Sequence, residues 1–188
     1  MYVFISKTVD FLRRTDIMDT AISVASEVAG VLPTHRQCSI QIKNKCSNYT
    51  LLHINSGWCV EMLPPTIDPS SDGKGLFSKT ADTARGAVGV FTYDVVNKST
   101  KEVTEKIAVM FSVPYDFNFY SNWFAVGVFG KDTKCDHDLY HNMYNNEENK
   151  FSRKKGGCCV SYKNDRITIL ATMSDSFQPD MKVEVSDS

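Results

Sequence analysis

Short β-like runs separated by turn residues are the feature that most constrains the fold of this chain. The clearest is residues 106–113, where Ile107, Val109 and Phe111 alternate with smaller or polar neighbours at a period of two. Further runs extend over Ser39 to Ile42, Thr50 to Ile54, Ala87 to Tyr93, Phe124 to Phe129, Cys158 to Tyr162, Ile167 to Met173 and Lys182 to Val185. Many short strands with turn clusters between them predict an antiparallel β-sandwich.

A helix is expected before the first strand. From Met18 the apolar residues follow the spacing of three and four that marks one helical face. They are Ala21, Ile22, Ala25, Val28, Ala29 and Leu32. Pro33 ends the pattern. With a second helix near 136–146, the predicted class is mainly β (α+β): an antiparallel sandwich flanked by two helices.

One domain is the simplest organisation for 188 residues without repeats or low-complexity linkers. Residues 38–188 are predicted to form the sandwich and residues 18–32 the helix. Residues 1–17 either lengthen that helix or form an extra N-terminal extension. Residues 63–76 contain three prolines and are interpreted as an irregular surface connection.

An aromatic loop follows the strand at 106–113. Pro114 ends strand pairing because it has no backbone donor, and Asp116 with Asn118 favours a turn. The rings Tyr115, Phe117, Phe119, Tyr120 and Trp123 are therefore expected at or near the surface. Amphipathic rings suit the boundary between water and lipid headgroups. The alternative is that these rings pack over an edge of the sandwich.

The net charge, the hydropathy and the candidate metal ligands narrow the classes of function open to this chain. The net charge of −1 gives no global attraction to nucleic acid or anionic lipid. We expect a soluble protein, because there is no apolar run of about 20 residues and no visible export signal. Cys135, His137 and His141 are spaced like zinc ligands, but exposed helix residues are the favoured interpretation. We predict no metal, no cofactor and no enzymatic activity, and free thiols for the six cysteines.

The segment from Phe111 to Trp123 resembles the signature loop of the actinoporins, the pore-forming cytolysins of sea anemones and their relatives. Residues 85–90, residues 139–144 and Arg36 before the first strand agree in order, so the resemblance covers roughly residues 18 to 175. Residues 48–51, 56–57 and 168–174 resemble the actinoporin-like proteins of fishes more than the anemone toxins.

That resemblance implies a phosphocholine pocket, in which aromatic faces hold the quaternary ammonium and hydroxyls meet the phosphate. The matching positions are Ser56, Val88, Ser112, Pro114, Tyr120, Tyr140 and Tyr144. Phe119 and Trp123 are expected to dip into the membrane interface, and Arg36 to contact a phosphate near the hinge. Some positions depart from the anemone pattern: Phe119 and Phe124 stand where tryptophan is usual, Asn145 replaces a tyrosine, and residues 152–156 form a basic cluster expected to be a solvated turn.

The resemblance also implies a mechanism. A soluble monomer docks on phosphocholine lipids, sphingomyelin above all, and its N-terminal helix detaches and enters the target membrane. Copies of the chain then assemble into a homo-oligomeric, cation-permeable pore. The alternative is a non-lytic module that uses the same pocket for lipid or carbohydrate.

Overall fold

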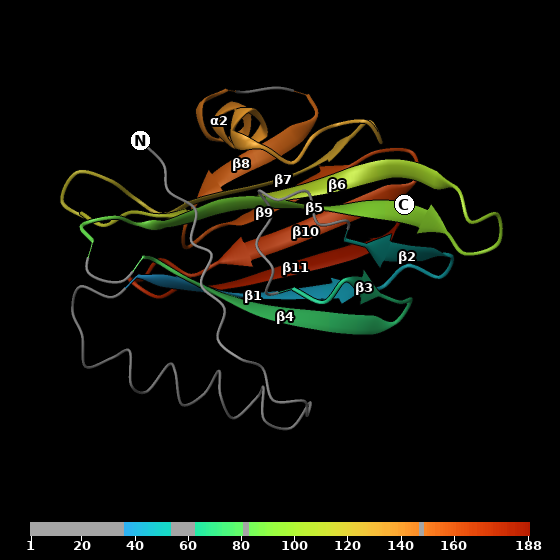
Figure 1. The fold of residues 1–188 in the computed structure, drawn as a ribbon, viewed down its shortest axis with the longest axis horizontal. Coiled ribbons are helices and arrows are strands. Elements are labelled where there is room, and N and C mark those ends of the chain that lie inside the picture. The colour runs from blue at the N-terminus through green and yellow to red at the C-terminus, as the bar shows by residue number, and fades with distance from the viewer. Residues whose placement is uncertain (1–35, 54–62, 81–82, 147–148) are drawn as a thin grey trace.

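Two β-sheets packed face to face make up the computed structural model, which describes residues 36–53, 63–80, 83–146 and 149–188 (Figure 1). The five-stranded sheet has the order β4 (Ser71–Ser78), β1 (Gln37–Asn44), β11 (Asp180–Asp187), β10 (Ile167–Met173) and β9 (Cys159–Lys163). The six-stranded sheet has the order β3 (Thr66–Ile67), β2 (Tyr49–Leu52), β5 (Ala87–Asn97), β6 (Val103–Val113), β7 (Trp123–Phe129) and β8 (Phe151–Lys155). The predicted β-sandwich is therefore confirmed.

Neighbouring strands are antiparallel except for β1 and β11, which pair in parallel with Ile40 opposite Met181. Each predicted strand is present, with ends that differ by a few residues. The expectation of an entirely antiparallel sandwich is wrong at this one pair, because a distant C-terminal strand lies beside β1.

Alternation along β6 gives the sheet two apolar faces. Ile107, Val109 and Phe111 point into the core between the sheets, where the ring centroids of Phe77 and Phe111 are 5.1 Å apart. Ala108 and Met110 point outward into a second apolar cluster. Because both faces of β6 are buried, this strand is a rigid base for the loop that follows it.

The outer cluster is covered by α2 (His137–Asn145), seen above the six-stranded sheet in Figure 1. Asp136 caps the helix by accepting a hydrogen bond from the Leu139 amide at 3.0 Å. Leu139, Tyr140 and Met143 form the buried face of the helix. The helix predicted near 136–146 is thereby confirmed.

Two regions differ from the sequence interpretation. Residues 63–76 are not an irregular connection, because they contain β3 and most of β4. The inward positions of β4 include Gly73, where a Cβ atom would overlap the Pro64 ring. Close packing against a neighbouring loop therefore requires glycine where a strand usually shows an apolar side chain. Likewise, the basic cluster at 152–156 is not a solvated turn, since four of its five residues belong to β8.

The predicted N-terminal helix, with Ala21, Ile22, Ala25, Val28, Ala29 and Leu32, lies outside the described residues. Within them the structure has one helix, α2, instead of the two that were expected. No helix in the described ranges has the length and apolarity to cross a membrane.

The cysteines do not all remain free thiols. Cys38, Cys46, Cys158 and Cys159 are free, but Cys135 takes part in a disulfide bond. The prediction of free thiols is therefore wrong for Cys135. Since this sulfur is already bonded, it offers no thiolate to a metal, which removes one member of the weighed zinc set. Among the described residues no group of three or more side chains is placed to hold a metal ion.

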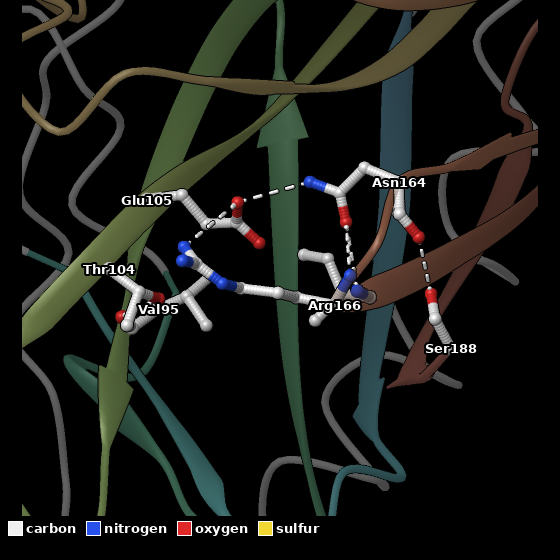
Figure 2. A network of polar contacts seen from close by, with 7 residues as sticks. Val95, Thr104, Glu105, Asn164, Arg166 and Ser188 are labelled. Atoms are coloured by element: carbon white, nitrogen blue, oxygen red, sulfur yellow. Dashed lines mark hydrogen bonds and ion pairs between the residues drawn. The ribbon is translucent and has the colours of Figure 1, made fainter.

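A polar network closes one end of the sandwich (Figure 2). Asn164 donates a hydrogen bond from Nδ2 to Glu105 Oε2 at 3.0 Å, and its Oδ1 accepts one from the Arg166 amide at 3.0 Å. Ser188 donates from Oγ to the Asn164 carbonyl at 2.8 Å. Glu105 lies near the start of β6, whereas the aromatic loop leaves the other end of this strand. The network therefore marks the end of the molecule remote from the aromatic loop.

Candidate functional site at the aromatic end

A row of side chains crosses the outer face of the six-stranded sheet at its aromatic end. Strand register places Val88 opposite Ser112, Ser112 opposite Trp123, and Trp123 opposite Lys155. Directly opposite residues on adjacent strands point to the same face. The row therefore joins two predicted pocket residues, a predicted interface ring and one basic residue.

Two tyrosines of α2 stand beside this row. The rings of Tyr140 and Tyr144 are stacked, with centroids 5.8 Å apart and planes inclined by 13°. Tyr140 is buried in the outer cluster, and Tyr144 and Val88 pack against that cluster while keeping part of their surface exposed. Four predicted pocket residues, Val88, Ser112, Tyr140 and Tyr144, thus share one face of the sandwich. Ser56, also predicted for the pocket, lies outside the described residues.

The aromatic loop itself exposes two large rings. Phe119 is 81% exposed and Tyr120 is 61% exposed, so most of both side chains is open to solvent. Asp116 shapes the turn: its side chain accepts a hydrogen bond from the Asn118 amide at 2.8 Å, and its carbonyl accepts one from the Tyr120 amide at 3.2 Å. Pro114, at the start of the loop, is half-buried.

Arg36 attaches the loop to the sandwich. Its side chain donates from Nε to the Pro114 carbonyl at 3.1 Å and from Nη2 to the Tyr115 carbonyl at 2.7 Å. Its guanidinium carbon also lies 5.3 Å from the Phe117 ring centroid and 5.5 Å from that of Tyr115. Burial lowers the pKa of this guanidinium, and Tyr115 and Asp116 oppose that shift. The contact with lipid phosphate that was predicted for Arg36 stays a prediction.

Phe177, in the loop between β10 and β11, is a ring that sequence reasoning missed. It is 53% exposed and packs edge-on against Phe117, with centroids 4.7 Å apart. A single large ring among Ser174, Asp175 and Ser176 was the available signal. The exposed aromatic surface therefore extends from the predicted loop to a second loop.

Asn122 joins the loops at this end. Its side chain is buried and donates from Nδ2 to the Ser176 carbonyl at 2.8 Å. Its backbone carbonyl accepts a hydrogen bond from the Gly156 amide, at the turn after β8, at 3.0 Å. The aromatic loop, the β8–β9 turn and the β10–β11 loop are therefore held together as one surface.

Two cations flank Trp123. The Arg153 guanidinium carbon lies 4.7 Å from the ring centroid of Trp123, and Lys155 Nζ lies 5.5 Å from it. Both distances fall within the range of cation–π attraction. Sequence reasoning missed these partners because it placed the basic residues in a turn instead of an edge strand beside β7.

The departures from the anemone pattern have different surroundings. Phe124 is fully buried in the core between the sheets, so this ring is not part of the exposed aromatic surface. Asn145 is exposed at the end of α2 and donates from Nδ2 to the His141 carbonyl at 3.0 Å.

Comparison with known proteins identifies the family. The family model described as "Sea anemone cytotoxic protein" matches residues 19–176, which is most of the chain. The chain therefore belongs to the sea anemone cytotoxic protein family, the actinoporins. This is a family of pore-forming toxins and not of enzymes.

Individual relatives match this chain either over a short segment or at low sequence identity. DELTA-alicitoxin-Pse1b of Phyllodiscus semoni is 46% identical over 63 residues, which are 34% of this chain and 25% of the toxin. The match therefore spans about a quarter of the length of that relative. Bryoporin of Physcomitrium patens is 26% identical over 162 residues, covering 84% of this chain and 88% of bryoporin.

A solved structure shares the architecture. The lipid-binding protein Nakanori superimposes with a TM-score of 0.57 at 8% sequence identity, over 89% of this chain and 79% of its own. At that level of identity the similarity concerns the fold alone.

Proposed function

We propose that this protein is a membrane-binding pore former. A soluble monomer binds phosphocholine headgroups at the aromatic end of the sandwich, and residues 18–32 then enter the bilayer of the target cell. Several copies assemble into a cation-permeable pore. Membership of a cytotoxic family supports the general function, while the headgroup, the inserting segment and the assembly are parts of the proposal.

The observation that carries the proposal is the arrangement of four side chains on one face. Stacked Tyr140 and Tyr144 lie beside the paired residues Val88 and Ser112. Aromatic faces attract a quaternary ammonium, and a serine hydroxyl donates a hydrogen bond to a phosphate oxygen. Exposed Tyr120 and half-buried Pro114 complete the proposed pocket from the loop side. Sphingomyelin carries this headgroup and is the proposed lipid.

Insertion of the N-terminal segment is consistent with its composition. Residues 14–32 as one helix span about 28 Å at 1.5 Å per residue, against a hydrocarbon core of about 30 Å. Asp16, Asp19 and Glu27 would face lipid around a lone helix, at a cost of several kcal/mol. Assembly around a wet lumen removes that cost, so oligomerisation belongs to the proposed mechanism.

Two assays on the same vesicles test this function. Flotation with sphingomyelin-containing vesicles measures binding, and release of an encapsulated dye measures pore formation. We expect both, and we expect neither with vesicles that lack choline headgroups. Binding without dye release contradicts the pore and supports the non-lytic alternative, whereas absence of both contradicts the proposed function as a whole.

A further inference from the structure

Arg153 and Lys155, the two cations beside Trp123, are the basic residues of β8 that lie over an aromatic ring. In the part of the chain that the structure describes, no carboxylate lies within ion-pair distance of Arg153 or Lys155. Lys155 is exposed and Arg153 is half-buried, so both charges remain accessible from solvent. An indole attracts each cation but does not neutralise it. Two like charges on one ring therefore leave a local positive site in a chain whose net charge is −1.

Strand geometry directs this site toward the proposed headgroup pocket. Arg153 and Lys155 are two residues apart on β8, so their side chains point to the same face as Trp123 and Ser112. Lys154, between them, points to the other face. Ser112 on β6 and Lys155 on β8 are separated by two strand spacings, about 10 Å. A second headgroup thus has room beside the one proposed at Ser112.

The position of the site also decides which anion reaches it. Trp123 follows the aromatic loop, and the turn after β8 is hydrogen-bonded to Asn122 of that loop. The exposed rings Phe119, Tyr120 and Phe177 belong to the same linked surface. When these rings meet a bilayer, Arg153 and Lys155 come to the level of the headgroups, where anionic lipids attract basic side chains.

We propose that Trp123, Arg153 and Lys155 form a second headgroup site, which binds the phosphate or carboxylate of an anionic phospholipid next to the phosphocholine pocket. The inference rests on the proposed membrane docking and adds a lipid preference to it. Arg153 supplies a planar fork of donors for an anionic oxygen pair, and Lys155 supplies a mobile point charge. Trp123 holds the two cations at the interface.

The test compares vesicles of phosphocholine lipids alone with vesicles in which about a fifth of the lipid is phosphatidylserine, at low and high salt. Flotation of the full chain should tighten on the order of tenfold with phosphatidylserine at low salt, because each basic side chain near an anionic surface adds attraction. The gain should disappear at high salt, where the Debye length falls to about 3 Å. Binding to the zwitterionic vesicles should change little with salt.

Matched variants assign the effect to the site. Arg153→Gln with Lys155→Gln should abolish the gain from phosphatidylserine. Lys98→Gln with Lys163→Gln removes the same charge from exposed positions at the opposite end of the sandwich, where the polar network lies, and should keep the gain. Arg153→Lys should keep most of it. Thermal unfolding of each variant checks that the fold persists.

The outcomes separate the two proposals. If the parent binds phosphocholine vesicles but shows no gain with phosphatidylserine, or if the control pair loses the gain equally, the second headgroup site is wrong and phosphocholine docking stands. If the parent binds only the anionic vesicles, phosphocholine docking is wrong and the anionic site stands. The variant Arg153→Gln with Lys155→Gln could also lose thermal stability yet keep the full gain in binding from phosphatidylserine. In that case the two cations have only a structural role on the edge strand, and the inference is wrong.

Discussion

The guanidinium of Arg36 lies 4.7 Å from the ring centroid of Phe177, while its Nη2 atom donates to the Tyr115 carbonyl. One buried side chain therefore joins the aromatic loop to the loop between β10 and β11. Arg36 directly precedes β1, and only residues 33–35 separate it from the segment proposed to enter the membrane. In the proposed mechanism, a headgroup that displaces these contacts would loosen the aromatic loop and the start of β1 together, and so link docking to the proposed insertion of residues 18–32.

Replacing Arg36 tests this attachment. Arg36→Gln leaves two carbonyls without a charged donor, and hydrogen bonds to charged groups contribute about 1.5–3 kcal/mol. We expect the free energy of unfolding to fall by about 2–3 kcal/mol and amide exchange in residues 115–121 to accelerate. Arg36→Lys keeps the charge but not the fork of donors, so an intermediate loss is expected in urea unfolding. Unchanged stability and exchange in the Gln variant would refute the attachment.

The exposed rings should serve binding and not stability. Tyr120→Ala and Phe119→Ala remove largely exposed side chains, so vesicle flotation should be lost while the unfolding midpoint stays close to that of the parent. Phe124→Ala is the contrasting variant, because truncating a fully buried ring costs about 3–5 kcal/mol. If both exposed-ring variants bind vesicles like the parent, the aromatic loop is not the docking surface.

A proline in the N-terminal segment should separate binding from pore formation. Ala25→Pro interrupts the predicted helix, where proline costs about 3 kcal/mol, but it leaves the aromatic end unchanged. Flotation should therefore persist while dye release stops, provided that circular dichroism shows a folded sandwich. Dye release at the parental rate from this variant would exclude residues 18–32 as the inserting helix.

Buried thiols predict how stability varies with pH. Burial raises the pKa of Cys46 to about 12, with Asp187 adding to the shift, and burial and Asp180 also raise the pKa of Cys38. Unfolded thiols ionise near pH 8.5. Above that pH the unfolded chain binds fewer protons than the native one, so the free energy of unfolding should fall as pH rises toward about 12.

Urea unfolding at about pH 7.5 and about pH 10 measures this slope. Cys46→Ala removes one of the two thiols and should make the fall shallower, although its stability at neutral pH will be lower because a buried side chain is truncated. An equal slope in the parent and the variant would show that Cys46 ionises as easily in the native state as in the unfolded one.

How far the sequence predicted the fold depended on the periodicity of each segment. Alternation at 106–113 is strong because Ile107, Val109 and Phe111 face the core, and β6 appears where it was expected. In β4 the inward positions include Gly73 and Gly75, so the strand lacks the usual apolar alternation, and at Gly73 close packing against Pro64 leaves no room for a side chain. In β8 three consecutive basic residues concealed an edge strand, although lysine is common on exposed edges.

The candidate site was predictable only in part. The resemblance named Val88, Ser112, Tyr140 and Tyr144, and the structure gathers them on one face although they come from three separate elements. Phe177 and Arg153 were not predicted, because each contributes through a partner distant in the sequence. Phe177 contacts Arg36, and Arg153 contacts Trp123. Such pairs depend on strand order, which local pattern does not reveal.

Competition by soluble headgroups tests the central claim most directly. Vesicle binding should be inhibited by phosphocholine and only weakly by phosphoethanolamine, because a primary ammonium is smaller and more strongly hydrated than the quaternary group that aromatic faces attract. On zwitterionic vesicles the inhibition should vary little with salt, since cation–π contacts are short-ranged and the net charge is only −1. Flotation titrated with each compound at low and high salt decides the matter. Selective inhibition by phosphocholine is the predicted result, and equal inhibition by the two headgroups, or none by either, would contradict a choline pocket at Val88, Ser112, Tyr140 and Tyr144.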